Sequence, residues 1–173
     1  MQRLEFQFPS TRFMAEKSKR KLSVHEQNAY MHQICPGFKC RVQNGRLSCN
    51  GTVQPFPFTE KYAVRISYRV GELPRVYVDK PALKRRQADE PIPHTYTGDR
   101  PCLFFPPNDS EWSAQKIIAG TIVPWLAEWL FYYEAWSSTG VWQGGGVHFN
   151  AEDKKENGLG QSEQPSNQGD SES

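Results

Sequence analysis

The central part of the chain alternates apolar and polar residues with a period of two. Between Phe38 and Val78 the apolar positions that follow this period are Leu47, Cys49, Val53, Tyr62, Val64, Ile66, Tyr68, Val70, Val76 and Val78. This spacing places every second side chain on one face, as in a half-buried β-strand. Turn-forming residues interrupt it at Asn44-Gly45, at Pro55-Phe56-Pro57 and from Gly71 to Pro74. The pattern predicts an antiparallel meander of three or four strands with one wet face.

Two other segments have a helical period. Ser23 and Glu26 form the S-x-x-E pattern of a capping box, and the apolar residues behind it suit a short helix that ends before Pro36. After Ser113 the apolar positions with helical spacing are Ile117, Ile118, Ile122, Trp125, Leu126, Trp129, Leu130, Tyr133 and Trp136. Gly140 is placed to end this second helix, and Pro124 to kink or split it. We expect one main core helix here, or two.

The remaining segments have no sustained period. The secondary structure of residues 1–22 is left open, because Leu4, Phe6 and Phe8 alternate with polar residues as in a strand but Pro9 ends the run. Residues 79–112 are rich in proline and predict a long irregular segment of the kind that is usually functional. From residue 150 onward the chain is too polar to bury a core, so we expect a flexible acidic tail. The prediction is one α+β domain over residues 1–149 and a tail over 150–173.

The charge of the chain is small in total and uneven in distribution. The formal net charge is +2, but residues 1–46 carry nine Lys and Arg against three Asp and Glu, and residues 150–173 carry two Lys against six Asp and Glu. A basic cluster without interleaved aromatic residues is more typical of a solvated surface than of a nucleic-acid site. Glu128 and Glu134 interrupt the longest apolar stretch, so no membrane span is expected.

The four cysteines are Cys35, Cys40, Cys49 and Cys102. No apolar leader segment precedes them, so we expect reduced thiols in a cytoplasmic protein. A zinc site with a nearby histidine is not favoured, because no C-x-x-C pair is present. We expect neither a metal nor a cofactor.

The irregular segment holds the candidate chemistry. Cys102 lies in a proline-rich loop with His94 and Arg100, and a nucleophilic thiol needs partial exposure and nearby positive or hydrogen-bonding groups. The alternative is that Cys102 is a small buried apolar residue ahead of Leu103. The pattern of this loop by itself leaves both readings open.

A longer string of residues carries a resemblance. It consists of Pro93-His94-x-Tyr96-x-Gly98-x-x-x-Cys102-Leu103, Trp112-Ser113, Pro124-Trp125-x-x-Glu128-Trp129-Leu130-x-Tyr132-Tyr133-Glu134-x-Trp136 and Thr139-Gly140-x-Trp142-x-Gly144-Gly145. Over residues 23–148 the chain resembles the prokaryotic relatives of ubiquitin-conjugating enzymes that accompany a cyclic-oligonucleotide synthase in bacterial anti-phage operons. The resemblance implies a ubiquitin-conjugating-enzyme-like fold with an N-terminal helix, a β-meander, an active-site loop and C-terminal core helices.

The resemblance also implies a reaction. Cys102 would carry the carboxyl terminus of a partner protein as a thioester and pass it to an amine of a target protein. The implied partner is a cyclic-oligonucleotide synthase of the cGAS-like nucleotidyltransferase group. No Gly-rich nucleotide-binding βα unit is visible, so a separate activating enzyme is a possible further partner.

The roles of the residues around Cys102 stay open. Eukaryotic relatives have His-Pro-Asn, whereas this chain has His94-Thr95-Tyr96 and no asparagine to steady an oxyanion. His94 can hold the loop through backbone hydrogen bonds or act as a base on the incoming nucleophile. Tyr96 can line the thioester channel or pack under the loop.

Two other functions compete with the enzyme. One is a non-catalytic binding module on the same fold that regulates the synthase, and the presence of Cys102 favours the enzyme over it. The other is a nucleic-acid-binding protein, which depends on the basic amino-terminal region alone.

Overall fold

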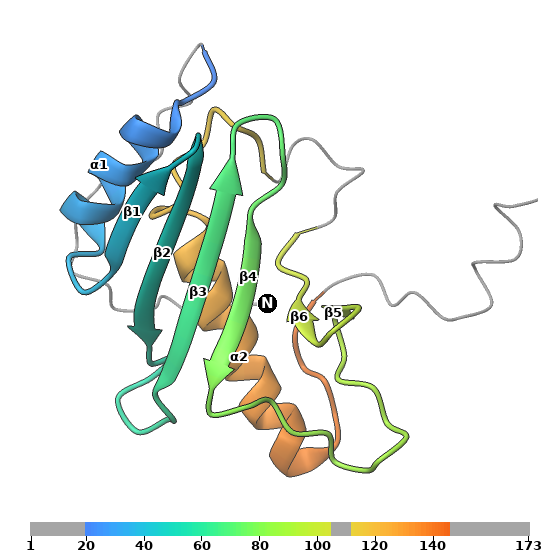
Figure 1. Cartoon of the computed structure of the whole chain (residues 1–173). Coiled ribbons are helices and arrows are strands. Elements are labelled where there is room, and N and C mark those ends of the chain that lie inside the picture. The colour runs from blue at the N-terminus through green and yellow to red at the C-terminus, as the bar shows by residue number, and fades with distance from the viewer. Residues whose placement is uncertain (1–19, 105–111, 146–173) are drawn as a thin grey trace, which may run out of the picture.

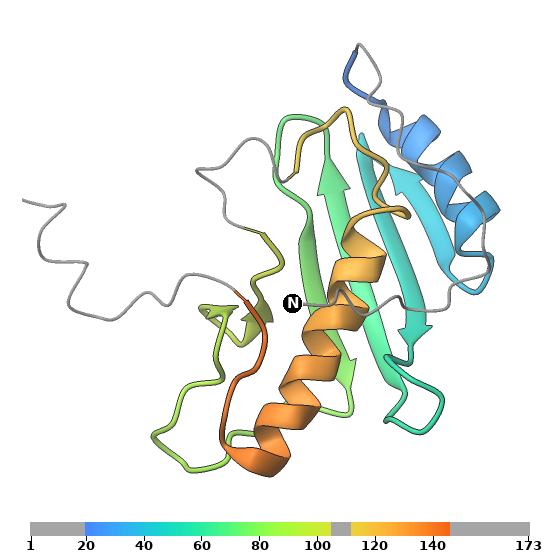
Figure 2. The same ribbon diagram turned by 180° about the vertical axis from the view of Figure 1, so that it is seen from behind.

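The computed structural model describes residues 20–104 and 112–145. The expected tail over residues 150–173 and most of the open segment before residue 22 lie outside these ranges. Four strands form one antiparallel sheet in the order β1-β2-β3-β4. The helix α1 lies beside β1, and the long helix α2 crosses behind the sheet (Figures 1 and 2). The architecture is α+β, as the sequence predicts.

The strands are β1 (Lys39–Gln43), β2 (Arg46–Val53), β3 (Tyr62–Arg69) and β4 (Arg75–Lys80). Each is antiparallel to its neighbour, which confirms the predicted meander. The turn between β1 and β2 holds Asn44 and Gly45 at φ 51° and 69°, a left-handed pair that matches the twist of a two-residue hairpin. In β3 buried residues alternate with partly or fully exposed ones, so one face of the sheet is buried and the other is reached by solvent.

Helix α1 (Val24–Ile34) begins at the predicted capping box. The Glu26 amide donates to the Ser23 hydroxyl at 3.2 Å, and the Ser23 amide donates to the Glu26 carboxylate at 2.9 Å. Arg20 also pairs with Glu26, at 2.6 Å. The reciprocal bonds satisfy backbone donors that a helix start leaves free, so local sequence determines where this helix begins.

A buried glutamine ties α1 to the segment that leads into α2. Gln27 is fully buried, its side-chain amide donates to the Lys116 carbonyl at 2.8 Å, and its side-chain oxygen accepts from the Ile118 amide at 2.9 Å. The Leu22 amide donates to the Ala114 carbonyl at 2.8 Å in the same region. The hydrophobic period of the sequence does not indicate that this polar residue is buried. Its side chain supplies the hydrogen bonds that a buried irregular segment needs.

Helix α2 (Ile122–Thr139) is one helix and begins later than its apolar pattern does. Ile117 and Ile118 lie in turns before it. Pro124 falls within the first turn, where the missing N–H has no intrahelical partner to lose, so it neither kinks nor splits the helix. Gly140 ends the helix at φ 80°, as predicted.

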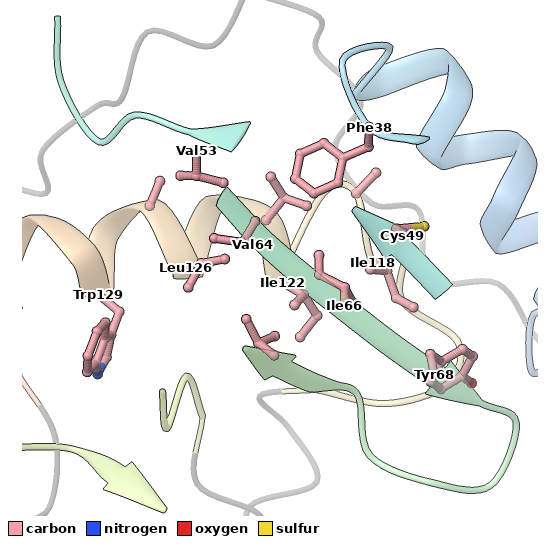
Figure 3. Packing of buried hydrophobic residues seen from close by; sticks show 14 of the residues in the cluster. Phe38, Cys49, Val53, Val64, Ile66, Tyr68, Ile118, Ile122, Leu126 and Trp129 are labelled. Carbon is pink, nitrogen blue, oxygen red and sulfur yellow. The ribbon is translucent and has the colours of Figure 1, made fainter. Parts of the chain in front are cut away.

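The core lies between the sheet and α2 (Figure 3). Val64 and Ile66 of β3 face Ile122 and Leu126 of α2 there. Ile66, Ile122 and Leu126 have no exposed surface. Burial of side chains of this size contributes about 1.5–3 kcal/mol each, which fixes α2 against the sheet.

The expectation of four reduced thiols is wrong for one pair. Cys40 and Cys49 are directly opposite in the β1–β2 ladder with their Cα atoms 4.0 Å apart, and their sulfurs are bonded. Neighbouring antiparallel strands bring facing side chains close enough for such a bridge. Cys35 and Cys102 are free thiols.

No helix within the described residues combines the length and the apolar character that a bilayer crossing requires.

Candidate active site

A short hairpin positions the candidate cysteine. Strand β5 (Thr95–Tyr96) pairs with β6 (Arg100–Pro101), and Cys102 follows directly. The turn between the two strands holds Gly98 at φ 79° and Asp99 at φ 53°. Figure 1 shows this hairpin beside β4, at the edge of the sheet. Part of the segment expected to be irregular is therefore a two-stranded hairpin.

The backbone of His94 fixes the base of the hairpin. Its carbonyl accepts from the Cys102 amide at 2.8 Å and from the indole N–H of Trp129 at 2.9 Å. His94 itself has a left-handed φ of 52°. Because Trp129 belongs to α2, this shared acceptor connects the cysteine to the core helix. These bonds are made by a main-chain atom, so both roles considered for the His94 side chain stay predictions.

The side chain of His94 lies in an aromatic cluster. Its ring centroid is 5.0 Å from that of Trp142, with 32° between the ring planes. The ring centroid of Trp142 in turn lies 5.8 Å from that of Trp129 and 6.0 Å from that of Tyr132. Trp142 follows α2 in the chain, so the cluster holds the segment after the helix against the loop that carries Cys102.

The thiol of Cys102 is not sealed in the core. Cys102, Leu103 and Phe104 are all partly exposed. The Cys102 thiol donates to the Phe104 carbonyl at 3.5 Å, and the Tyr96 hydroxyl donates to the same oxygen at 3.5 Å. The shared acceptor brings the sulfur and the phenol together at the protein surface.

Tyr96 keeps its proton in this position. Partial burial raises its pKa, and the hydrogen bond and charge interaction with Cys102 raise it further, against a smaller opposite effect of Arg100. The Arg100 guanidinium lies 5.3 Å from the centre of the Tyr96 ring. A protonated phenol beside a thiol is a hydrogen-bond donor at the place where chemistry on sulfur would occur.

A groove adjoins the loop that carries Cys102. Its volume is about 380 Å³, and its lining residues are Glu72, Leu73, Pro74, Arg75, Val76, Tyr96, Arg100, Pro101, Leu103 and Phe104. One of these residues, Leu73, is 46% exposed and so offers apolar surface to a molecule in the groove. Cys102 itself does not line this groove, but its chain neighbours Pro101 and Leu103 do, so the groove lies along the loop that carries the thiol.

The comparison with protein families identifies the chain. A family model described as Type II CBASS E2 protein matches residues 27–149, which include the hairpin, Cys102 and α2. The chain belongs to the Type II CBASS E2 family. The family resemblance expected from the motif string is therefore confirmed. A search of curated proteins finds no match.

Membership of the CBASS E2 family supports an E2-like role in anti-phage defence. The helix, meander, hairpin and helix order is consistent with the E2 name. The family also implies a partner from the same operon, such as the cyclic-oligonucleotide synthase.

The structure adds residues that sequence reasoning did not single out. The helical spacing predicts Trp129 as a core residue, and its indole N–H also donates to the His94 carbonyl, a contact that the spacing does not indicate. The Phe104 carbonyl is the common acceptor for the thiol and the phenol, and a backbone atom leaves no trace in a residue pattern. Among the described residues no three His, Cys, Asp or Glu side chains gather as metal ligands would.

Proposed function

We propose that this CBASS E2 protein carries the carboxyl terminus of a partner protein as a thioester on Cys102 and transfers it to an amine. The observation that supports this most directly is the partly exposed residue Cys102, whose chain neighbours line the groove and whose amide donates to the His94 carbonyl. The carried protein is the cyclic-oligonucleotide synthase of the operon, and the transfer regulates anti-phage signalling.

The reaction has two acyl transfers. In the first, the Cys102 sulfur loses its proton and attacks the carbonyl of an activated carboxyl terminus, such as an acyl adenylate made by a separate activating enzyme. A C–S bond forms and the activating group leaves. In the second, the target amine attacks the thioester, a C–N bond forms, the C–S bond breaks and the amine loses a proton. Since a thioester is already activated, the protein's task is mainly to position the two partners.

Tyr96 takes the part of the missing asparagine in this proposal. Its hydroxyl and the Cys102 thiol share the Phe104 carbonyl, so the phenol lies close to the carbon that would become tetrahedral. Its raised pKa keeps it a donor, which is what a developing oxyanion requires. His94 is a positioning residue, because its carbonyl holds the Cys102 amide.

The groove receives the last residues of the carried chain. Leu73, Val76 and Leu103 offer apolar contacts, while Arg75 and Arg100 add positive charge. An extended peptide fits such a groove, since its backbone can lie along the rim while alternate side chains point inward. The peptide carboxyl group then ends at the sulfur.

The proposal is tested by co-expressing the chain with its operon neighbours and analysing non-reducing gels with and without added thiol. The wild type should form an adduct that thiol removes, and Cys102→Ser should form a thiol-resistant ester. Cys35→Ser is the matched control, because Cys35 is the other free cysteine, and it should behave as the wild type. No adduct with either the wild type or Cys102→Ser would refute the thioester and favour the non-catalytic binding module.

A further inference from the structure

The outer face of the sheet, turned away from α2, is open and rich in cations. Figure 1 looks onto this face. Its cations are Lys39, Arg41, Arg46, Arg65, Arg69 and Arg75, which we call the basic sheet face. Each lies at an outward position of a strand whose alternate residues are buried or partly buried. This surface is distinct from the groove near Cys102, and Arg75 is the one residue of the basic sheet face that also lines the groove.

The strand register sets these cations side by side. Arg46 of β2 is directly opposite Arg69 of β3, a like-charge pair that costs stability. Glu72 offsets part of this cost, with its carboxylate 3.3 Å from Arg46 and 4.0 Å from Arg69. Within the described part of the chain, Lys39 and Arg41 of β1 form no ion pair with a carboxylate.

The cations border a shallow depression. Lys39, Arg41, Arg46 and Arg69 line it together with polar side chains that include Ser48, and its volume is about 720 Å³. The lining is polar and charged, so the ligand that fits it is an anionic and hydrophilic one. An apolar helix or strand would gain little from this surface.

The chain itself contains a segment of that chemistry. Residues 150–173 carry six Asp and Glu against two Lys, and they include no aromatic residue. We propose that this acidic segment docks on the basic sheet face of the same molecule. The contact is electrostatic, because the segment's aliphatic residues are limited to Ala151 and Leu159.

The geometry permits the docking. The described chain runs back from α2 to lie beside β5 and β6, near the β4 edge of the sheet (Figures 1 and 2). Four strands span about 15 Å, and 24 residues of random-coil chain would have a root-mean-square extent of about 25 to 30 Å. Because the segment is tethered, its effective concentration at the face is of millimolar order, which lets weak ion pairs populate the docked state.

Nucleic acid is a poorer match for the same surface. Single-strand binding relies on aromatic side chains that stack on bases. The outward aromatic residue of the ladder is Tyr77, and the Arg65 guanidinium already lies 4.4 Å from its ring centre. An acidic peptide needs no such stacking. The docked segment would cover these cations, so an acidic partner would have to displace the segment to reach them.

Photo-crosslinking on the full chain tests the docking. Benzoylphenylalanine replaces Leu159, and the crosslinked peptides are mapped by mass spectrometry. We expect crosslinks to residues 39–50, and we expect their yield to fall in 1 M NaCl, where the screening length is about 3 Å. Lys39→Glu with Arg41→Glu should lower the yield about fivefold, the loss expected from two exposed ion pairs.

Matched controls separate docking from damage to the fold. Lys61→Glu with Lys84→Glu reverses two exposed cations outside the basic sheet face and should leave the yield unchanged. A charge swap is the second control. When Glu152, Asp153 and Glu156 are replaced by lysine in the chain that carries Lys39→Glu and Arg41→Glu, opposite charges face each other again and crosslinking should return.

Three results would overturn the proposal. The first is a crosslink pattern that charge reversal does not change, or one that lies on another surface. The second is crosslinks between isotopically labelled and unlabelled chains, which would mean contact between two molecules. The third is a thymidine oligonucleotide that binds the full chain and loses binding on reversal of Lys39 and Arg41, without any crosslink to residues 39–50.

Discussion

Trp129→Phe tests the connection between the core helix and the cysteine loop. The substitution removes the indole N–H that donates to the His94 carbonyl at 2.9 Å and keeps an aromatic ring in the same place. The carbonyl retains its bond from the Cys102 amide, so it is not left without a donor. We therefore expect a folded protein whose cysteine loop is held less tightly.

The cost can be worked from the contacts. One hydrogen bond contributes about 0.5–1.5 kcal/mol net. Trp129 is 5% exposed, so the smaller ring also loses roughly 40 Å² of buried apolar surface, or about 1 kcal/mol. The free energy of unfolding should fall by about 2 kcal/mol, which corresponds to a Tm decrease of about 5 to 10 °C.

Urea unfolding and hydrogen exchange measure the two parts separately. Urea unfolding should give the full loss, and the Cys102 amide should exchange faster in Trp129→Phe than in the wild type. Trp136→Phe is the control, because it contracts a buried ring two turns further along α2. It should lose about 1 kcal/mol and leave exchange at Cys102 unchanged. Equal exchange rates at Cys102 in the two variants would refute the anchoring role of Trp129.

Three further predictions concern the thiols, the phenol and acid stability. Tyr96→Phe should slow adduct formation by about a hundredfold at nearly unchanged stability, and a rate within twofold of the wild type would exclude Tyr96 as the oxyanion donor. Iodoacetamide at pH 8 should label Cys102 before Cys35, because burial raises the pKa of Cys35 to about 11 and leaves roughly one thiolate per thousand thiols; equal labelling would contradict this. Arg20 and the capping bonds lower the pKa of Glu26 to about 2, below its value in the unfolded chain. Its contribution to stability is therefore complete above about pH 4.5 and lost as the pH falls towards 2, and Glu26→Gln should flatten the urea midpoint across that window.

Local sequence is enough for the elements whose cause is local. The capping bonds of Ser23 and Glu26 lie within one helical turn, so the start of α1 could be read directly from residues. The period-two run from Leu47 to Tyr68 likewise determines which face of the sheet is buried, since alternation is a property of the extended backbone. The motif string around Cys102 was sufficient to indicate the family.

The candidate site was predicted less completely than the fold. One hairpin and its base bring Cys102, His94 and Tyr96 together. Because these residues are near one another in the chain, their proximity could be predicted without a structure. The shared Phe104 carbonyl and the groove could not be anticipated, because the first is a backbone atom and the second needs the β3–β4 turn beside the hairpin.

The sequence by itself thus determined the four-stranded meander, the two helices, the buried face of the sheet and the motif string that indicates the family, but not the β5–β6 hairpin. The tertiary structure alone decided that Gln27 is buried, that Cys40 and Cys49 are bonded and that Trp129 holds the His94 carbonyl. The physical reason is the range of the interactions. Capping and alternation involve neighbours in the chain, whereas Gln27 and Trp129 reach their partners only after distant segments have packed together. The Cys40–Cys49 bond depends on the register in which β1 and β2 pair.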